Sequence, residues 1–324
     1  MMNINRRKTM LFLGLTFFIS WGLIAVFYYS VNSPGIYLSS TIRIFYMCIP
    51  ACVAIFVQKF IYGNSIKNAL GISFNFNRWF IFAWLFPPLI AFVTFSISLF
   101  LPNVEYDPNM SGMFELLGKT LTSQQIEQMK SQAATLPISP FWLALIQGMV
   151  AGITVNTIVA LGEELGWRGF LHNEWKIIGF WKSSIMIGIV WGIWHAPLIL
   201  KGHNYPQHPA IGIFMMIVWC VLISPIFSYI RIRSNSTIAT SILHGTLNGT
   251  GILAVMMLKG GNDLLIGLTG LVGFLVLFIV NICLLCLTKG RFCRRWSGML
   301  QDVTLDDYGR QFGCDRRCKG KENP

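Results

Sequence analysis

The stretch Leu161-Gly-Glu-Glu-Leu-Gly-Trp-Arg-Gly-Phe170 has two adjacent carboxylates, Glu163 and Glu164, directly after the uncharged run 141–161. On a helix Glu164 and Arg168 lie four residues apart on one face, within reach of an ion pair, whereas Glu163 points about a quarter turn away. Ionisable side chains at membrane depth are costly, and they usually face a bundle interior or a water-filled cavity. The stretch therefore predicts a polar site inside a membrane bundle. A solvated helix end at the membrane surface is the alternative.

The composition of the chain indicates a membrane protein. Of its 324 residues 54% are hydrophobic and only 12% are charged, whereas soluble domains are roughly 45–50% apolar. The net charge of +12 would suit a nucleic-acid partner, but basic residues in a multi-span protein also serve as topology signals and contacts to anionic lipids. We expect contact with an anionic cytoplasmic leaflet and no nucleic acid.

Eight apolar segments are long enough to cross a bilayer as helices. The sequence thus predicts an all-α polytopic protein with eight spans at 10–29, 40–57, 79–101, 141–161, 183–200, 210–230, 237–258 and 264–288. A cleaved signal peptide is the alternative for the first span, but its apolar core would have only about 7–15 residues. Arg43, near the start of the second span, is expected to extend to the membrane interface.

The longest polar connection is 102–140, where Thr122 and Gln125 form a capping-box pattern that predicts a short helix at 123–134. We expect a small extracytoplasmic cap there, without chemistry. The domain organisation is then a cytoplasmic N-terminus at 1–9, a membrane domain at 10–288 and a basic cytoplasmic tail at 289–324. The tail contains Cys293, Cys314 and Cys318. The spacing of Cys314 and Cys318 lacks a second Cys/His pair, so it is weak evidence for zinc, and a labile disulfide in the tail is an alternative.

The distribution of basic residues predicts the orientation of the chain. With eight spans, 20 Lys and Arg residues lie on the face that has both termini, and four lie on the opposite face. Short cytoplasmic loops are enriched in Lys and Arg, so both termini are expected in the cytoplasm, most simply at the plasma membrane. The same count puts Glu163 and Glu164 at the cytoplasmic end of the fourth span. The polar cavity is therefore expected to open to the cytosol.

Two of the five histidines, His195 and His244, lie within apolar spans. Each has a companion four residues away on the same helical face, Trp191 and Asn248 respectively. A hydrogen-bonded structural role is the alternative for each histidine taken alone. Together with the carboxylates, however, these pairs come from three different helices, and one shared polar cavity accounts for all of them. The other three histidines, His172, His203 and His208, are expected at the surface.

The motifs Glu-Glu-x-x-x-Arg at 163–168, aromatic-x-x-x-His at 191–195 and His-x-x-x-Asn at 244–248 resemble, in this order, those of the CPBP family. This family contains the type II CAAX prenyl endopeptidases and bacterial relatives linked to bacteriocin processing and self-immunity. The resemblance covers about 141–258. Trp191 stands where the family usually has Phe, and we expect little consequence, because a large aromatic ring still packs beside His195.

The resemblance implies intramembrane hydrolysis of a peptide bond in a membrane-associated peptide of the CAAX, pheromone or bacteriocin type. By analogy with the family, Glu163 is the general base that activates a water molecule, assisted by His195. His244 and Asn248 stabilise the oxyanion. Glu164 and Arg168 form the ion pair that fixes the backbone at Glu163.

A catalytic zinc ion held by Glu163, His195 and His244 is an alternative, because three protein ligands plus water are typical of such sites. The chain lacks His-Glu-x-x-His, and a glutamate mechanism fits the same residues, so metal-independent chemistry is favoured. Two other functions remain open. One is a non-catalytic immunity protein that sequesters a peptide. The other is a proton-coupled transporter, against which the sequence shows no repeated halves.

Overall fold

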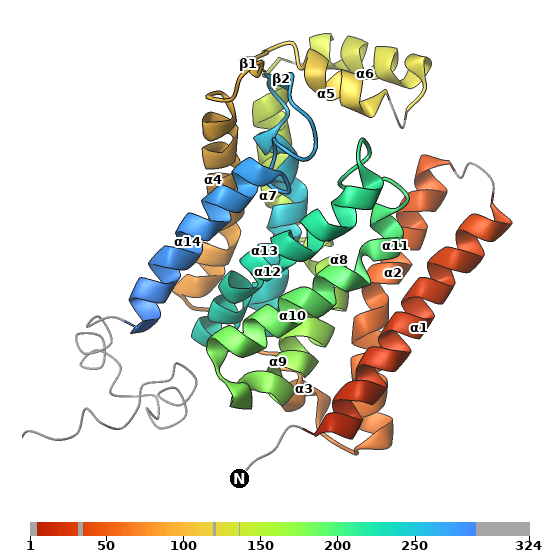
Figure 1. Cartoon of the computed structure of the whole chain (residues 1–324), viewed down its shortest axis with the longest axis vertical. Coiled ribbons are helices and arrows are strands. Elements are labelled where there is room, and N and C mark those ends of the chain that lie inside the picture. The colour runs from red at the N-terminus through yellow and green to blue at the C-terminus, as the bar shows by residue number, and fades with distance from the viewer. Residues whose placement is uncertain (1–4, 32–34, 119–120, 136, 290–324) are drawn as a thin grey trace, which may run out of the picture.

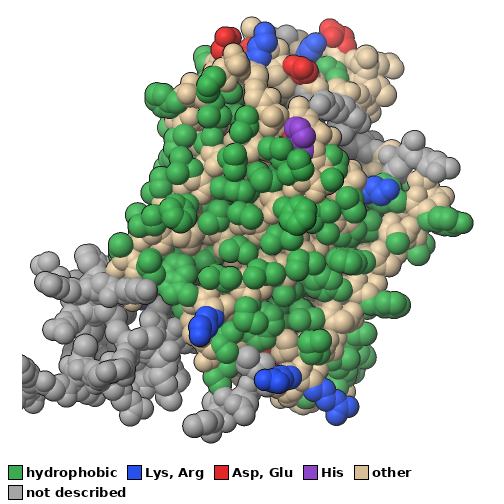
Figure 2. Space-filling model, in the orientation of Figure 1, with side chains coloured by type: hydrophobic (Ala, Val, Ile, Leu, Met, Phe, Trp, Pro, Cys, Tyr) green, Lys and Arg blue, Asp and Glu red, His purple; other side chains and the backbone are tan. Residues whose placement is uncertain are grey.

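The computed structural model describes residues 5–31, 35–118, 121–135 and 137–289, and this part of the chain is almost entirely helical (Figure 1). The all-α prediction is therefore confirmed. Figure 2 shows a broad belt of hydrophobic side chains between a face with acidic and basic residues and an opposite face with basic ones. This pattern is that of an integral multi-pass membrane protein.

Five helices in the described residues are long and apolar enough to cross a bilayer, and a sixth span results if one bent pair is counted. The five are α1 (Arg6–Ser30), α2 (Ile36–Phe56, continued to Ile61 by the π-helix η1, Val57–Ile61), α4 (Arg78–Ser98), α12 (Pro209–Ser234) and α14 (Leu271–Lys289). A count of eight is thus not reached by length and composition, and it stays a prediction.

The three remaining predicted spans are interrupted helices. In the fourth, α7 (Pro140–Ile153) and α8 (Val155–Glu164) meet at 52°. In the fifth, α10 (Phe180–Trp194) is followed after His195 by the short α11 (Ala196–Ile199). The break has a covalent cause, because Pro197 has no N–H to bond to the carbonyl four residues earlier. In the seventh, α13 (Thr237–Thr250) ends in a 3₁₀ turn, η4 (Gly251–Ala254).

The two carboxylates lie in the interior of a helical segment and not at its end. Beyond α8 the chain continues through a π-helix, η2 (Leu165–Leu171), then α9 (His172–Trp175) and a 3₁₀ turn, η3 (Lys176–Ile178). Single π-helical turns within α-helices are frequent at functional sites. The predicted end of the fourth span at Leu161 is therefore about five helical turns short of the end of this segment at Ile178, at 3.6 residues per turn.

The helices at the centre of the bundle pack closely against one another. Helix α13 packs against α4, α7 and α8, and α10 packs against α12. A Cβ atom on Gly148 would lie 2.4 Å from the carbonyl oxygen of Gly249, and one on Gly162 would lie 2.6 Å from that of Met47 in α2. Glycines at these contacts let the backbones approach. They hold α7 against α13 and α8 against α2. Since α13 also packs against α8, the helices that bear the motifs form the centre of the bundle.

A cap covers the face opposite the described N-terminal end (Figure 1). Its strand β1 (Glu105–Tyr106) pairs antiparallel with β2 (Leu258–Lys259), and its helices are α5 (Ser111–Leu117) and α6 (Ser123–Thr135). The capping box is confirmed, since Thr122 and Gln125 exchange hydrogen bonds of 2.9 and 3.3 Å. The short α3 (Ile66–Ala69) lies between η1 and α4 in sequence. The predictions for the tail, including Cys293, Cys314 and Cys318, fall outside the described residues.

Candidate functional site

Glu163 is held by two tryptophans. Its side chain is buried, and its Oε2 atom accepts hydrogen bonds from the indole nitrogens of Trp191 at 2.7 Å and Trp167 at 3.4 Å. The spacing of charged residues in the sequence predicts no partner for this carboxylate. Trp167, four residues after Glu163 on the same helical face, was the signal that could have identified one.

Glu164 joins two motifs. Its Oε1 atom accepts from Arg168 Nη1 at 3.1 Å, which is the ion pair expected from the spacing, and also from His244 Nδ1 at 2.9 Å. Glu164 and Arg168 are both fully buried. The guanidinium of Arg168 lies 4.3 Å from the ring centroids of both Trp191 and Phe227. Glu164 therefore connects α8 to α13, beyond the local role that the sequence suggested.

His195 lies at the break between α10 and α11. Its Nδ1 atom is 2.8 Å from the carbonyl oxygen of Trp191. A carbonyl oxygen can only accept, so Nδ1 carries the hydrogen and Nε2 of the neutral ring has a lone pair. The imidazole packs 5.7 Å from the ring of Trp191, as expected from the aromatic-x-x-x-His motif. His195 is thus oriented as a proton acceptor.

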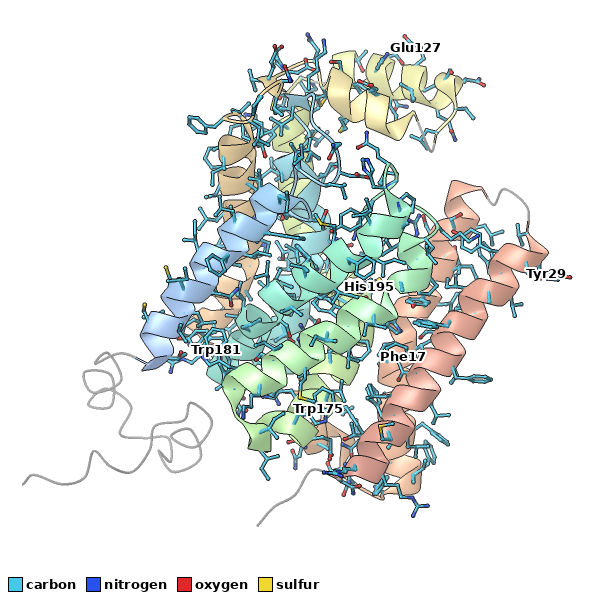
Figure 3. All side chains as sticks on the ribbon, in the orientation of Figure 1. Phe17, Tyr29, Glu127, Trp175, Trp181 and His195 are labelled. Carbon is cyan, nitrogen blue, oxygen red and sulfur yellow. The ribbon has the colours of Figure 1, made fainter. Side chains whose placement is uncertain are left out.

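A cavity of about 810 Å³ brings the predicted site residues together, and it is lined by Glu163, Trp191, His195, His244 and Asn248. These side chains come from α8, α10 with its break, and α13. In Figure 3 His195 lies at an intermediate height, between Glu127 of the cap and Trp175 near the opposite face. Glu163, the two histidines and Asn248 therefore line one interior cavity, and Glu164 and Arg168 lie behind its wall.

The lining of the cavity extends into the cap. Its further lining includes Gly112, Met113 and Glu115 of the cap helix α5, and Asp263 after β2. On the opposite side, the residues after Glu163 in η2 are fully buried and close the site, namely Trp167, Arg168, Phe170 and Leu171. The expected opening of the cavity to the cytosol stays a prediction. The 102–140 connection also contributes to the cavity wall, which the sequence did not indicate.

The other histidines are not simply surface residues. His172 is buried in α9, so its predicted exposure is wrong. His208 Nδ1 lies 2.6 Å from Asp263 Oδ1, and the same carboxylate accepts from the backbone N–H of Gln207 at 2.7 Å. His203 is half-buried and lines the cavity. The turn between α11 and α12 thus forms a polar part of the cavity rim.

The proposed zinc set does not fit the described residues. No three His, Cys, Asp or Glu side chains in the described part of the chain come together as metal ligands. Glu163, His195 and His244 are thus not grouped as metal ligands in the described residues. The choice between zinc and metal-independent chemistry stays a prediction.

Comparison with known proteins adds two similarities. Residues 137–250 match the family described as "Type II CAAX prenyl endopeptidase Rce1-like". The chain is also 36% identical over 63 residues to a protein named CAAX prenyl protease 2 from Methanococcus maripaludis. That alignment covers 19% of this chain and 22% of the relative, so it spans about a fifth of the relative's length. The family match contains Glu163, His195, His244 and Asn248.

Proposed function

We propose that this chain, which is similar to the CPBP/CAAX protease family over residues 137–250, is a member of that family and a membrane-embedded endopeptidase. It hydrolyses a peptide bond in a membrane-associated peptide of the CAAX, pheromone or bacteriocin type. The observation that carries the proposal is the cavity in which the Glu163 carboxylate meets His195, His244 and Asn248. Its apolar walls, including Trp194, Leu198 and Met216, suit hydrophobic substrate residues.

In the proposed reaction Glu163 is the general base. Both indoles bind its Oε2 atom, which leaves Oε1 to accept a proton from a water molecule. The resulting hydroxide attacks the carbonyl carbon of the scissile bond, and His195 Nε2 orients the water by accepting its second hydrogen. Glu163 then donates the captured proton to the leaving amine, so the carboxylate is regenerated. The reaction is metal-independent in this proposal.

His244 and Asn248 stabilise the oxyanion of the tetrahedral intermediate. The Nδ1–H of His244 donates to Glu164. In the proposal His244 is an imidazolium, so it also has an Nε2–H, and this second N–H donates to the oxyanion. The negative charges of Glu163 and Glu164 are then balanced by the positive charges of Arg168 and His244. Such pairing is needed because an unpaired buried charge is strongly destabilising. Asn248 supplies a second donor from the next helical turn. Each such donor contributes roughly 3–4 kcal/mol to the transition state.

The test is peptide cleavage by purified protein in liposomes. Glu163→Gln, His195→Ala and His244→Ala are each expected to abolish the cleavage that the wild type shows. Glu174→Gln is the matched control, because Glu174 forms an ion pair with Lys8 away from the cavity. Two outcomes would contradict the proposal. If the wild type cleaves no peptide but protects cells from one, and Glu163→Gln protects them equally, the protein is an immunity protein. If the wild type cleaves no peptide but conducts ions, it is a transporter.

A further inference from the structure

The carbonyl oxygen of Trp194 lies at the break between α10 and α11 and lacks its usual helical partner. In a continuous α-helix it would accept the N–H of Leu198, four residues later. That N–H instead donates to the carbonyl oxygen of His195 at 3.0 Å. Trp194 is fully buried, and buried carbonyl groups are almost always hydrogen-bonded. The break therefore creates an acceptor that another segment has to satisfy.

Two side chains of the first helices bind this carbonyl oxygen. The hydroxyl of Tyr46, on α2, donates to it, and the indole nitrogen of Trp21, on α1, donates to it at 3.3 Å. Neither residue is among those of the described chain that line the cavity, so neither contacts substrate in the proposed reaction. Both helices also lie outside the family match at 137–250. The N-terminal part of the chain thus contacts the motif helix directly beside His195.

The side chain of Trp194 is held by the same two helices. Its indole nitrogen donates to Ser20 Oγ on α1 at 2.9 Å, and its ring lies 4.2 Å from that of Tyr46. It also lies 5.0 Å from the imidazole of His195, edge to face. Because the carbonyl of Trp194 and the N–H of His195 belong to one planar peptide unit, holding the carbonyl fixes the direction in which the His195 side chain leaves the backbone.

Helix α2 contacts the backbone next to both proposed reactive residues. The carbonyl oxygen of Met47 would lie 2.6 Å from a Cβ atom on Gly162, the residue before Glu163. Tyr46, the neighbour of Met47, binds the residue before His195. Two adjacent residues of a helix are only about 1.5 Å apart along its axis. One short segment of α2 therefore holds α8 and the α10 break in a fixed relation to each other.

We propose that Tyr46 and Trp21 are positioning residues for His195. By holding the Trp194 carbonyl they place the His195 ring so that Nε2 reaches the water molecule that Glu163 activates. A small displacement of this ring would lower the rate, because proton transfer and attack depend on near-ideal geometry. This inference rests on the proposed function, since it adds support residues to the same site. It gives α1 and α2 a part in catalysis that acts through His195.

The test removes the Tyr46 hydroxyl but keeps its ring, in Tyr46→Phe. The substrate is the fastest-cleaved member of a pool of palmitoylated decapeptides with randomised C-terminal residues, in phosphatidylcholine liposomes. We expect kcat to fall about tenfold with KM unchanged, because Tyr46 acts on the geometry of the reaction and not on substrate binding. The double variant Tyr46→Phe/Trp21→Phe removes both donors and should lower kcat further.

Tyr205→Phe is the matched control. The Tyr205 side chain is also fully buried, and its hydroxyl donates to the carbonyl oxygen of Thr269 at 2.7 Å. Both Tyr→Phe variants lose one buried hydrogen bond to a backbone carbonyl, so they should lower the unfolding temperature by similar amounts. Only Tyr46→Phe should lower kcat. The comparison separates positioning of His195 from general stability.

A second measurement observes His195 directly, by nitrogen NMR of protein with isotope-labelled histidine. The His195 signals are identified by their loss in His195→Ala. In the wild type one tautomer is expected, because Nδ1 donates to the carbonyl oxygen of Trp191 at 2.8 Å. A displaced ring loses this bond, so Tyr46→Phe should show a mixture of both tautomers. Tyr205→Phe should keep the wild-type signals.

An unchanged His195 spectrum in Tyr46→Phe would overturn the inference, and so would a loss of kcat no larger than that in Tyr205→Phe. If the wild type cleaves no peptide, the proposed function fails separately, and the spectrum alone decides the inference. If Tyr46→Phe does not fold, Trp21→Phe takes its place with the same criteria. Its control is Trp84→Phe, because the Trp84 indole donates to the carbonyl oxygen of Met149 on another helix at 2.9 Å.

Discussion

The indole nitrogen of Trp191 donates to Glu163 Oε2 at 2.7 Å, across two helices of the bundle. The same tryptophan accepts a hydrogen bond through its carbonyl oxygen from His195 at 2.8 Å, and its ring lies 4.3 Å from the Arg168 guanidinium. One residue thus positions the proposed base, its assisting histidine and the buried cation. The expectation that an aromatic ring alone matters at this position is therefore incomplete.

Trp191→Phe is expected to lower kcat about tenfold, the cost of roughly 1.4 kcal/mol for one lost hydrogen bond to a charged group. The ring contacts with His195 and Arg168 persist in this variant, so the loss belongs to the indole N–H. Trp219→Phe is the matched comparison, because the Trp219 indole nitrogen is buried without a hydrogen-bond partner among the described residues. A loss in Trp219→Phe as large as that in Trp191→Phe would contradict the role of the donor.

Glu164 has two functions that substitutions can separate. Glu164→Gln leaves the Arg168 charge without a carboxylate partner, and breaking a buried pair costs about 3–5 kcal/mol. Both the unfolding temperature and the cleavage rate should therefore fall. The double variant Glu164→Gln/Arg168→Met removes the uncompensated charge and should recover most of the unfolding temperature. It should not recover activity, because His244 still lacks the carboxylate that orients it. Recovery of both would mean that Glu164 serves only Arg168.

Gly71 is required by both its conformation and its surroundings. It has a φ of +65°, and an added Cβ atom would lie 1.7 Å from Arg231 Nη2. The Arg231 Nε donates to the carbonyl oxygen of Arg168 at 3.2 Å, so a displaced Arg231 would disturb η2. Gly71→Ala is expected to lower the unfolding temperature more than Gly63→Ala does. Gly63 has a φ of +64° but no atom within 4 Å of an added Cβ. Equal effects would show that only the backbone conformation matters.

Acid should destabilise the folded protein through His203. Its pKa in the folded state is about 4, against an ordinary 6.5, because burial and then Arg43 disfavour the charged ring. Between these two values the unfolded chain binds a proton that the folded chain does not, so stability falls as the pH falls from 6.5 to 4. His203→Gln should flatten this part of the pH dependence, measured by thermal unfolding in detergent. An unchanged slope would indicate that His203 is not buried in solution.

The sequence predicted the elements that follow from local pattern. Apolar runs located α1, α2, α4, α12 and α14, and four-residue spacing gave the pair Glu164 and Arg168 as well as the packing of His195 beside Trp191. These features depend on residues that are close along one helix, where spacing and contact are directly related.

The features that the sequence missed depend on contacts between distant segments. The donation from Trp191 to Glu163 and that from His244 to Glu164 cross between helices. The burial of His172 depends on how far the fourth segment continues, and the place of α5 in the cavity wall depends on how the cap packs. Composition could not show this continuation, because Arg168 appears as a charge that ends a span, whereas the fold buries it against two aromatic rings.

The exposed cap offers a position for a label that identifies the compartment on its side of the membrane. Helix α6 projects from the cap (Figure 1) and is largely solvent-exposed, whereas α5 lies at the cavity and packs against β2. An epitope placed within α6 would therefore report the compartment of the cap in intact cells without altering the site. Because the cap lies on the face opposite the start of α1 (Figure 1), that compartment is the one the first residues of α1 do not face.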